Sequence, residues 1–201
     1  MHPLLEAALS HHDEGRSVIA VNQDKRPYHQ GWNEYFTRAQ TEEEVKKEFS
    51  NGADGLALIL YPSCPFCVLD FDGPHADDAW ASTGISLPAS ARIKTRSGGK
   101  HLYYRMPTDA PQFKRAVRIV KAPCDCKKSC GVDLLVHGYA LVPPSPGYSE
   151  DPNYPLESAV EVPIQIIALA VKNNTESPKR TGDIETGKVS HGERKSVLAS
   201  L

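Results

Sequence analysis

The chain has 201 residues, of which 40% are hydrophobic and 24% are charged, and its net charge is −2. This length and composition are typical of one soluble globular domain with a tail, and the small net charge argues against a protein that simply coats nucleic acid. No apolar run approaches the ~20 residues that span a membrane, and the N-terminus lacks a signal peptide, so we expect a cytoplasmic protein with no membrane partner.

The first 60 residues predict two helices and two strands. Apolar residues recur on one side of residues 4–14, which indicates an amphipathic helix. A short strand is expected at Val18–Val21. Thr41 and Glu44 form a capping box that marks the start of the second helix. The near-continuous apolar run over residues 55–60 is typical of a central strand.

The next strand, expected over residues 66–72, ends in two carboxylates one residue apart, Asp70 and Asp72. Because side chains alternate along a strand, both project from the same face, roughly 6–7 Å apart. Two carboxylates on one face repel each other, and a divalent cation is the usual resolution of that repulsion. The pattern alone also fits a solvated turn at the end of a strand.

The remaining elements follow from the same patterns of alternation, turn residues and caps. In chain order they are a helix over residues 75–84, a hairpin of strands 91–96 and 101–106, strands over 132–136 and 139–142 joined by a tight turn, a helix over 163–172, a polar linker over 173–190, and the start of a further helical region over 191–201. Because that last helix stops abruptly, we expect the chain to belong to a longer protein.

Two more features carry groups that can bind phosphate or metal. The hairpin turn Ser97-Gly-Gly-Lys-His101 exposes backbone N–H groups between a hydroxyl and an imidazole, and all of these can donate to phosphate oxygens. Asp133 begins a strand that follows a basic loop. Together with the first two acids it makes three carboxylates, which can hold two Mg²⁺ or Mn²⁺ ions for nucleotidyl transfer. Taken singly, each feature also fits a plain turn or a structural aspartate.

Charge is unevenly distributed along the chain. Residues 92–128 contain 11 Lys or Arg and only two acidic residues, for a net charge of +9. This asymmetry predicts an electropositive face suited to a phosphate-rich ligand, although a basic solvated hairpin is the simpler alternative.

The five cysteines include a dense group, Cys124, Cys126 and Cys130. This group suggests Zn²⁺, but a structural zinc site needs four ligands. The fourth ligand is open between Cys64, Cys67 and a histidine such as His137. Reduced thiols in a loop, or a local disulfide, are the alternatives.

An ordered set of motifs resembles the bifunctional primase–polymerase (Prim-Pol) domain of the archaeo-eukaryotic primase superfamily, over most of residues 5–170. The motifs are Asp70-x-Asp72, Ser97-Gly-Gly-x-His101, Gly131-Val-Asp133 and Gly138-Tyr139-x-x-x-Pro143-Pro144-Ser145. The resemblance implies an α/β (α+β) two-layer domain over residues 1–172, with a mixed, largely antiparallel, RRM-like central sheet. Helices would cover one side of that sheet, and the carboxylates would line a cleft on the other.

The resemblance also implies roles for single residues. Asp70, Asp72 and Asp133 would be the catalytic acids that bind two Mg²⁺ or Mn²⁺ ions. His101, with Ser97 beside it, would contact the phosphates of the incoming nucleotide, and Lys25 is a further candidate for nucleotide binding. Arg96 is a candidate by its charge alone. The implied partners are a single-stranded DNA template, NTP or dNTP, and a helicase domain in the same full-length phage or plasmid replication protein, in the host cytoplasm.

Two other functions remain open from the sequence. A metal-dependent nuclease or phosphodiesterase can use the same acids, but it has no need of a triphosphate-binding turn. A non-catalytic DNA-binding replication module that has kept the fold would not depend on Asp70 or Asp72.

Overall fold

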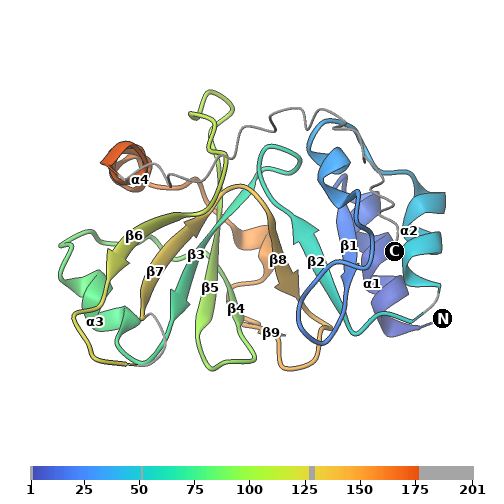
Figure 1. The fold of residues 1–201 in the computed structure, drawn as a ribbon, viewed down its shortest axis with the longest axis horizontal. Helices are drawn as coiled ribbons and strands as arrows, with labels where there is room; N and C mark the ends of the chain where they lie inside the picture. Colours follow the sequence, from blue (N-terminus) through green and yellow to red (C-terminus); the bar gives the residue numbers. More distant parts are fainter. Residues whose placement is uncertain (1, 51, 127–129, 177–201) are drawn as a thin grey trace, which may run out of the picture.

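The computed structural model describes residues 2–50, 52–126 and 130–176, which form two antiparallel sheets side by side (Figure 1). The smaller sheet has the strand order β1-β2-β8, with the apolar strand β2 in the middle. Its strands are β1 (Val18–Val21), β2 (Gly55–Ile59) and β8 (Tyr139–Val142).

The larger sheet has the order β6-β7-β3-β5-β4-β9, which makes the acidic strand β3 one of its two central strands. Its strands are β3 (Phe66–Asp72), β4 (Ala91–Lys94), β5 (Lys100–Arg105), β6 (Val117–Lys121), β7 (Gly131–Leu135) and β9 (Ser149–Glu150). Every pairing between these strands is antiparallel. The predicted α/β class with a largely antiparallel sheet is therefore confirmed.

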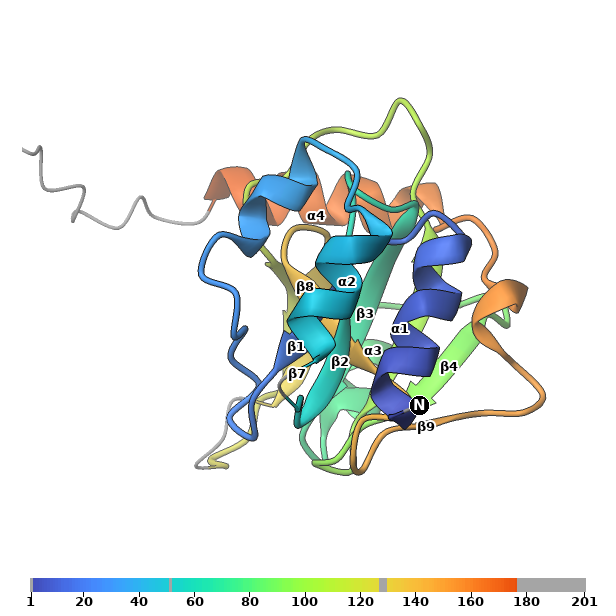
Figure 2. The same ribbon diagram turned by 90° about the vertical axis from the view of Figure 1, so that its right-hand side faces the viewer.

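Helices cover both sheets. Helices α1 (Pro3–Asp13) and α2 (Glu42–Phe49) pack side by side against the smaller sheet (Figure 2). Helix α4 (Ile164–Glu176) contacts β6, and the short helix α3 (Ala76–Ala81) contacts β7. Two 3₁₀ turns, η1 (Trp32–Phe36) and η2 (Leu156–Ser158), complete the elements. Among the described residues, no helix is both long and apolar enough to cross a membrane.

The two faces of β3 belong to two different hydrophobic cores. Phe66 and Val68 pack into the core beneath the smaller sheet, whereas Leu69 and Phe71 pack into the core beneath α3 and α4. Because side chains alternate, Asp70 and Asp72 continue the Val68 face. The acids therefore emerge from the face of the larger sheet that the smaller sheet adjoins, opposite α3 and α4.

At four points the fold departs from the expectations or goes beyond them. The expected strands β7 and β8 follow each other closely in the chain, but they lie in different sheets and do not pair. Strand β6 was not predicted, because its alternating residues sit in a strongly basic stretch. Helix α3 is shorter than the predicted 75–84, since it ends at Ala81 and the N–H groups of Thr83 and Gly84 bond to carbonyls only three residues back.

The fourth correction concerns the end of α4. This helix continues through Glu176 rather than ending at residue 172. Asn173, expected to open a linker, instead donates from its side chain to the carbonyls of Arg118 and Ile119 at 2.8 and 2.9 Å. The rest of the predicted linker, 177–190, and the predicted helical start, 191–201, lie outside the described residues.

Candidate active site

The sheet register brings three of the predicted site residues into one line. Asp70 on β3 is paired with Asp133 on β7 and with His101 on β5. Residues opposite one another in antiparallel strands project from the same face, with Cβ atoms ~4.5–5.5 Å apart. Asp72 projects from this face two residues further along β3. We call Asp70, Asp72 and Asp133 the carboxylate row.

Solvent can reach this row, although the strand itself is buried. The side chains of Asp70 and Asp133 are 28% and 27% exposed, whereas β3 is fully buried from Phe66 to Leu69. The two acids can therefore contact a ligand from solvent while their backbones stay fixed between neighbouring strands.

The row carries more negative charge than the groups around it neutralise. The pKa of Asp70 is raised to about 6, first by burial and then by the charges of Asp72 and Asp133, against the opposing charges of Lys25 and Arg118. Burial also raises the pKa of Asp133. Carboxylate oxygens are the ligands that Mg²⁺ and Mn²⁺ prefer, so this donor set fits the divalent ions expected from the sequence.

Arg118 is a member of the site that the sequence analysis missed. It lies opposite Asp133 in the β6–β7 pair, and its Nε is 2.5 Å from Asp133 Oδ1. The signal is the alternation Val117-Arg-Ile-Val-Lys121, which lies inside the basic stretch of residues 92–128. An arginine thus neutralises the third carboxylate and extends the line of paired residues to a fourth strand.

His101 forms the floor of the site. Its side chain is only 9% exposed, its Nε2 lies 3.5 Å from Asp70 Oδ1, and its buried Nδ1 has no hydrogen-bond partner. Burial, aided by the charge of Lys25, lowers its pKa to about 4. The imidazole is therefore neutral at physiological pH and can donate a single N–H to a ligand.

The hairpin turn between β4 and β5 is held against the end of β3. Gly98 has a positive φ of 87°, and a Cβ on Gly99 would overlap the carbonyl oxygen of Phe71. Glycine at position 99 is therefore what lets the turn approach the strand that carries the acids. Ser97 is exposed at this turn, with its hydroxyl 3.1 Å from that of Thr95.

Lys25 reaches the same site from the smaller sheet. Its loop follows β1 and gives it a φ of 66°, unusual for a residue other than glycine. The Tyr139 hydroxyl donates to the Lys25 carbonyl at 2.9 Å, and the Asn22 side chain accepts from Arg26 N at 2.9 Å. The Lys25 ammonium lies 5.7 Å from the centre of the Tyr148 ring. These contacts fix a cation opposite the carboxylates.

A cavity of about 290 Å³ connects these groups. It is lined by Lys25, Asp70, Asp72, Thr95, Ser97, His101 and Tyr148. Five of these were singled out from the sequence, and Thr95 and Tyr148 were not. Arg96 does not line the cavity, because its guanidinium donates to the Gln23 carbonyl at 3.0 Å and so ties the turn to the Lys25 loop.

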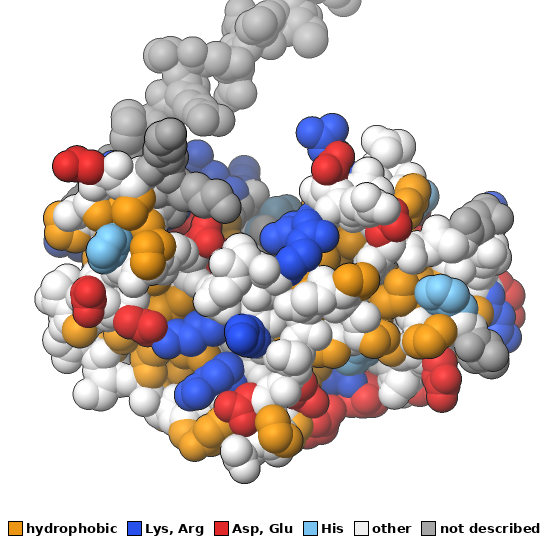
Figure 3. Space-filling model, turned by 90° about the horizontal axis from the view of Figure 1, so that it is seen from below, with side chains coloured by type: hydrophobic (Ala, Val, Ile, Leu, Met, Phe, Trp, Pro, Cys, Tyr) orange, Lys and Arg blue, Asp and Glu red, His pale blue; other side chains and the backbone are white. Residues whose placement is uncertain are grey.

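The predicted electropositive face is only partly present. Figure 3 shows Lys and Arg side chains beside Asp and Glu side chains on the face that looks onto the strand ends. Lys100 pairs with Asp77 at 2.5 Å, and Arg92 lies 3.7 Å from Asp151. Both pairs line a second cavity of about 430 Å³ on the other side of the β4–β5 turn. Acids from elsewhere in the chain therefore offset part of the charge of the basic stretch.

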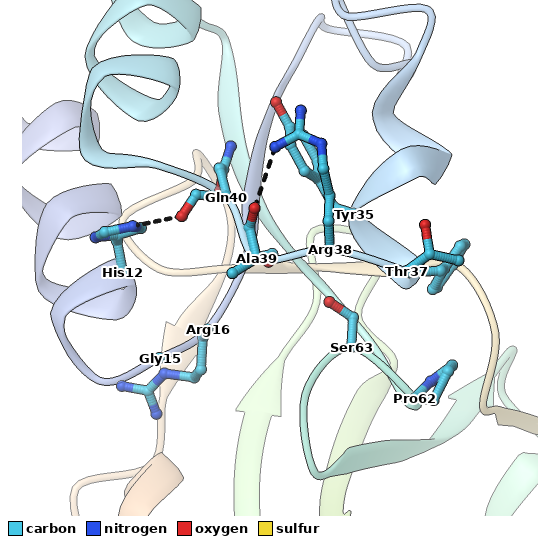
Figure 4. Close-up of a pocket in the computed structure, with 12 residues that line it drawn as sticks. His12, Gly15, Arg16, Tyr35, Thr37, Arg38, Ala39, Gln40, Pro62 and Ser63 are labelled. Atoms are coloured by element: carbon cyan, nitrogen blue, oxygen red, sulfur yellow. Dashed lines mark hydrogen bonds between the residues drawn. The ribbon is translucent and has the colours of Figure 1, made fainter.

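A third cavity, of about 390 Å³, lies between α1, η1 and the loop at Pro62 (Figure 4). Among the described residues that line it, none is an acid. His12 there binds the Gln40 carbonyl at 2.9 Å, and the buried guanidinium of Arg16 is paired with Glu14. We therefore assign the carboxylate row, not this cavity, as the candidate active site.

The structure bears on two of the alternatives for the cysteines, the disulfide and the fourth zinc ligand. All five cysteines are free, so the disulfide alternative is absent from the structure. Cys64 and Cys67 are buried in the two separate cores, and the His137 ring stacks on Phe36 with their centres 4.0 Å apart. None of the three supplies the fourth ligand that a zinc site with Cys124 and its neighbours would need.

Comparison with known families gives one match. A family model described as "Bifunctional DNA primase/polymerase, N-terminal" (Prim-Pol) matches residues 8–166. No curated protein matches the chain. The matched segment runs from α1 into α4 and contains the whole carboxylate row, His101 and Lys25.

Proposed function

Since the chain belongs to the bifunctional DNA primase/polymerase (Prim-Pol) family, we propose that it makes and extends primers on single-stranded DNA by template-directed nucleotidyl transfer. Family membership gives the coarse function, replication chemistry of the primase–polymerase type. The finer proposal is that Asp70, Asp72 and Asp133 are the catalytic acids and that the 290 Å³ cavity receives the triphosphate.

The single observation that carries this proposal is the cavity that joins carboxylates to a cation and phosphate donors. The acids supply oxygen ligands for two Mg²⁺ or Mn²⁺ ions, with Asp70 and Asp72 at the cavity and Asp133 in line beside Asp70. When bound, such ions would lower the pKa of the attacking 3′-hydroxyl and neutralise charge on the leaving pyrophosphate.

The remaining groups bind and orient the nucleotide. Lys25 brings the fixed positive charge, because the buried His101 is neutral and contributes one N–H donor instead. The Ser97 hydroxyl and the backbone N–H groups of the Gly98–Gly99 turn are further donors to phosphate oxygens. In the reaction the primer 3′-oxygen bonds to the α-phosphorus, the bond to pyrophosphate breaks, and the hydroxyl proton passes to solvent.

A triphosphate-binding side of the cavity is what separates this proposal from a nuclease. Phosphodiester hydrolysis needs the acids but not a lysine and a donor turn facing them. The template and the nucleoside triphosphate are the proposed partners, and a helicase elsewhere in the full-length protein remains a proposal that rests on the resemblance alone.

The test is the formation of product from labelled dNTP or NTP on unprimed and primed single-stranded DNA, with Mg²⁺ and with Mn²⁺. We expect synthesis and pyrophosphate release by the wild type and none by Asp70→Ala/Asp72→Ala. The charge-matched control is Asp78→Ala/Asp109→Ala, which removes two exposed acids outside the cavity and should keep full activity. Synthesis by the first double variant, or cleavage without triphosphate dependence, would contradict the proposal.

A further inference from the structure

Two loops meet just beyond the strand ends that carry the acids. The β3–β7 ladder ends at the pair Asp72–Gly131. From there β3 continues into a loop that contains His75, while the chain enters β7 from a loop that contains Cys124, Cys126 and Cys130. His75 and Cys130 each lie three residues from a member of the carboxylate row.

These residues lie close enough to share one ion. One ligand atom each from His75, Cys124 and Cys126 lies within 4.8 Å of the other two. Tetrahedral zinc, with Zn–S near 2.3 Å and Zn–N near 2.0–2.1 Å, requires ligand atoms about 3.5–4 Å apart, so only a small closure is needed. His75 stands at the N-terminus of α3, but its side chain makes no capping hydrogen bond there.

Cys130 lies beside this group, because Cys124 packs against the small buried cluster of Ala79, Ala122 and Cys130. Hydrogen bonds with the Cys126 backbone and thiol, and with the Cys130 thiol, lower the pKa of Cys124. The Cys130 side chain is buried and packs so closely on Gly73 that a Cβ there would overlap its sulfur. We call His75, Cys124, Cys126 and Cys130 the thiol cluster.

We propose that the thiol cluster is a structural Zn²⁺ site with three thiolate ligands and one imidazole ligand, His75. Thiolates and imidazole favour zinc, whereas the carboxylate row favours Mg²⁺ or Mn²⁺. On binding, the thiols lose their protons to solvent, and no oxidant or reductant is needed. Four protein ligands leave no open position, which is the arrangement of a structural rather than a catalytic zinc.

The site would fix the two strand ends relative to each other. The backbone pair Ala122 N–Cys130 O, at 3.0 Å, already closes the β6–β7 loop at its base. A metal at the loop tip would add a link from this loop to the segment after Asp72. Zinc would thereby hold Asp72 and Asp133 in place without touching the cavity, and the inference does not depend on the proposed nucleotidyl transfer.

The first experiment measures metal in the purified full chain, expressed without added metal. We expect one zinc per chain that survives gel filtration, and a Co²⁺-substituted form with the visible absorption of tetrahedral cobalt and a thiolate-to-cobalt charge-transfer band. A metal-free wild type with five reactive thiols, or a disulfide between two of the three clustered cysteines, would overturn the proposal. This readout requires no variant and no enzymatic activity.

Variants then assign the ligands. His75→Ala and Cys126→Ser should lose zinc on dialysis against EDTA, whereas His75→Cys should retain it and strengthen the cobalt charge-transfer band, because a fourth thiolate replaces the imidazole. The matched controls are His137→Ala and Cys64→Ala, which alter a histidine and a cysteine outside the cluster and should keep one zinc per chain. Zinc lost in His137→Ala but kept in His75→Ala would refute the assignment of His75.

Discussion

The carboxylate row and the thiol cluster lie at the same end of the same two strands, yet they differ in chemistry, in exposure and in the kind of metal ion that they suit. The row presents oxygen to a cavity shared with Lys25 and His101, whereas the cluster gathers sulfur and one imidazole around a buried thiol. Oxygen ligands with open neighbouring space suit an exchangeable ion, and a closed set of thiolates suits a permanent one. At each of the two strand ends, three residues of chain separate a proposed catalytic acid from a proposed zinc ligand.

The largest expected effect comes from single variants in each site, each assayed both for nucleotide incorporation and for zinc content. Asp72→Asn should reduce nucleotide incorporation by about a thousandfold, or roughly 4 kcal/mol, because one oxygen ligand is lost, while zinc content stays at one per chain. Cys126→Ser should lose zinc yet keep measurable synthesis in excess Mn²⁺. Parallel assays of incorporation and of metal content check both. Loss of zinc in Asp72→Asn would show that the two sites are not independent.

The second prediction concerns how the stability of the metal-free protein depends on pH, because of the raised pKa of Asp70 in the carboxylate row. The pKa of Asp70 is raised from 3.8 to about 6, so the folded state holds this proton more tightly than the unfolded state. Its contribution to stability is therefore greatest below pH 4 and is lost as the pH rises through 6, by about 2–3 kcal/mol.

Asp70→Asn should remove this loss. Its free energy of unfolding, relative to wild type, should rise between pH 4 and pH 6 and then stay level, as urea titrations in EDTA would measure. Asp78→Asn, which removes an exposed acid, is the control, and its relative stability should not rise between pH 4 and pH 6. An Asp70→Asn curve parallel to wild type across this range would contradict the assignment.

The third prediction compares Gly99 and Gly73. The first lets a turn approach the carboxylate row, and the second lets a loop approach the thiol cluster. Gly99→Ala should cost about 2 kcal/mol and raise KM for the nucleotide, because its Cβ would push the turn from the Phe71 carbonyl. Zinc content should not change. Gly73→Ala should instead weaken zinc retention, since its Cβ would displace Cys130.

Gly98→Ala is the control for backbone strain at this turn. It shares a positive φ with Gly73, but no atom lies within 4 Å of its added Cβ, so we expect a cost of about 1 kcal/mol and a smaller rise in KM than in Gly99→Ala. Thermal unfolding and nucleotide titration separate these outcomes. An equal rise in KM for Gly98→Ala and Gly99→Ala would show that the overlap with the Phe71 carbonyl is not the cause.

The smallest expected effect concerns Arg118, which pairs with Asp133 at 2.5 Å. Arg118→Gln should lower the Mn²⁺ concentration needed for half-maximal synthesis about fivefold, or ~1 kcal/mol, because the arginine no longer competes for that carboxylate. Lys121→Gln removes a cation from the end of the same strand and should leave the Mn²⁺ dependence unchanged. A higher Mn²⁺ requirement in Arg118→Gln would mean that the arginine orients Asp133 rather than competing for it.

Local patterns in the sequence were sufficient for the parts of the molecule that alternate cleanly. β3 and the β4–β5 hairpin follow from alternation and a glycine turn, and α2 from its capping box, which the structure contains. The same patterns predicted that Asp70 and Asp72 share a face. The exact line of Asp133 and His101 beside Asp70 depends on strand pairing, which single-strand patterns do not encode.

What the sequence did not predict depends on contacts between distant segments. His75 is 49 residues from Cys124, so only the pairing of β3 with β7 brings them together. Arg118 was missed because charge obscured the alternation of β6. The end of α4 was misjudged because the Asn173 side chain binds backbone carbonyls of β6, which makes a polar residue part of the fold.

The paired line from Arg118 through Asp133 and Asp70 to His101 makes the proposed catalytic site depend on the alignment of the sheet. A slip of β3 by one residue would turn the acids toward the core of α3 and α4 and expose Leu69 and Phe71 on the opposite side. An inactive alignment is thus also an unstable one, so the chain cannot accumulate a well-folded but misaligned form. Insertions or deletions of one residue within β3 should therefore be far less tolerated than substitutions there.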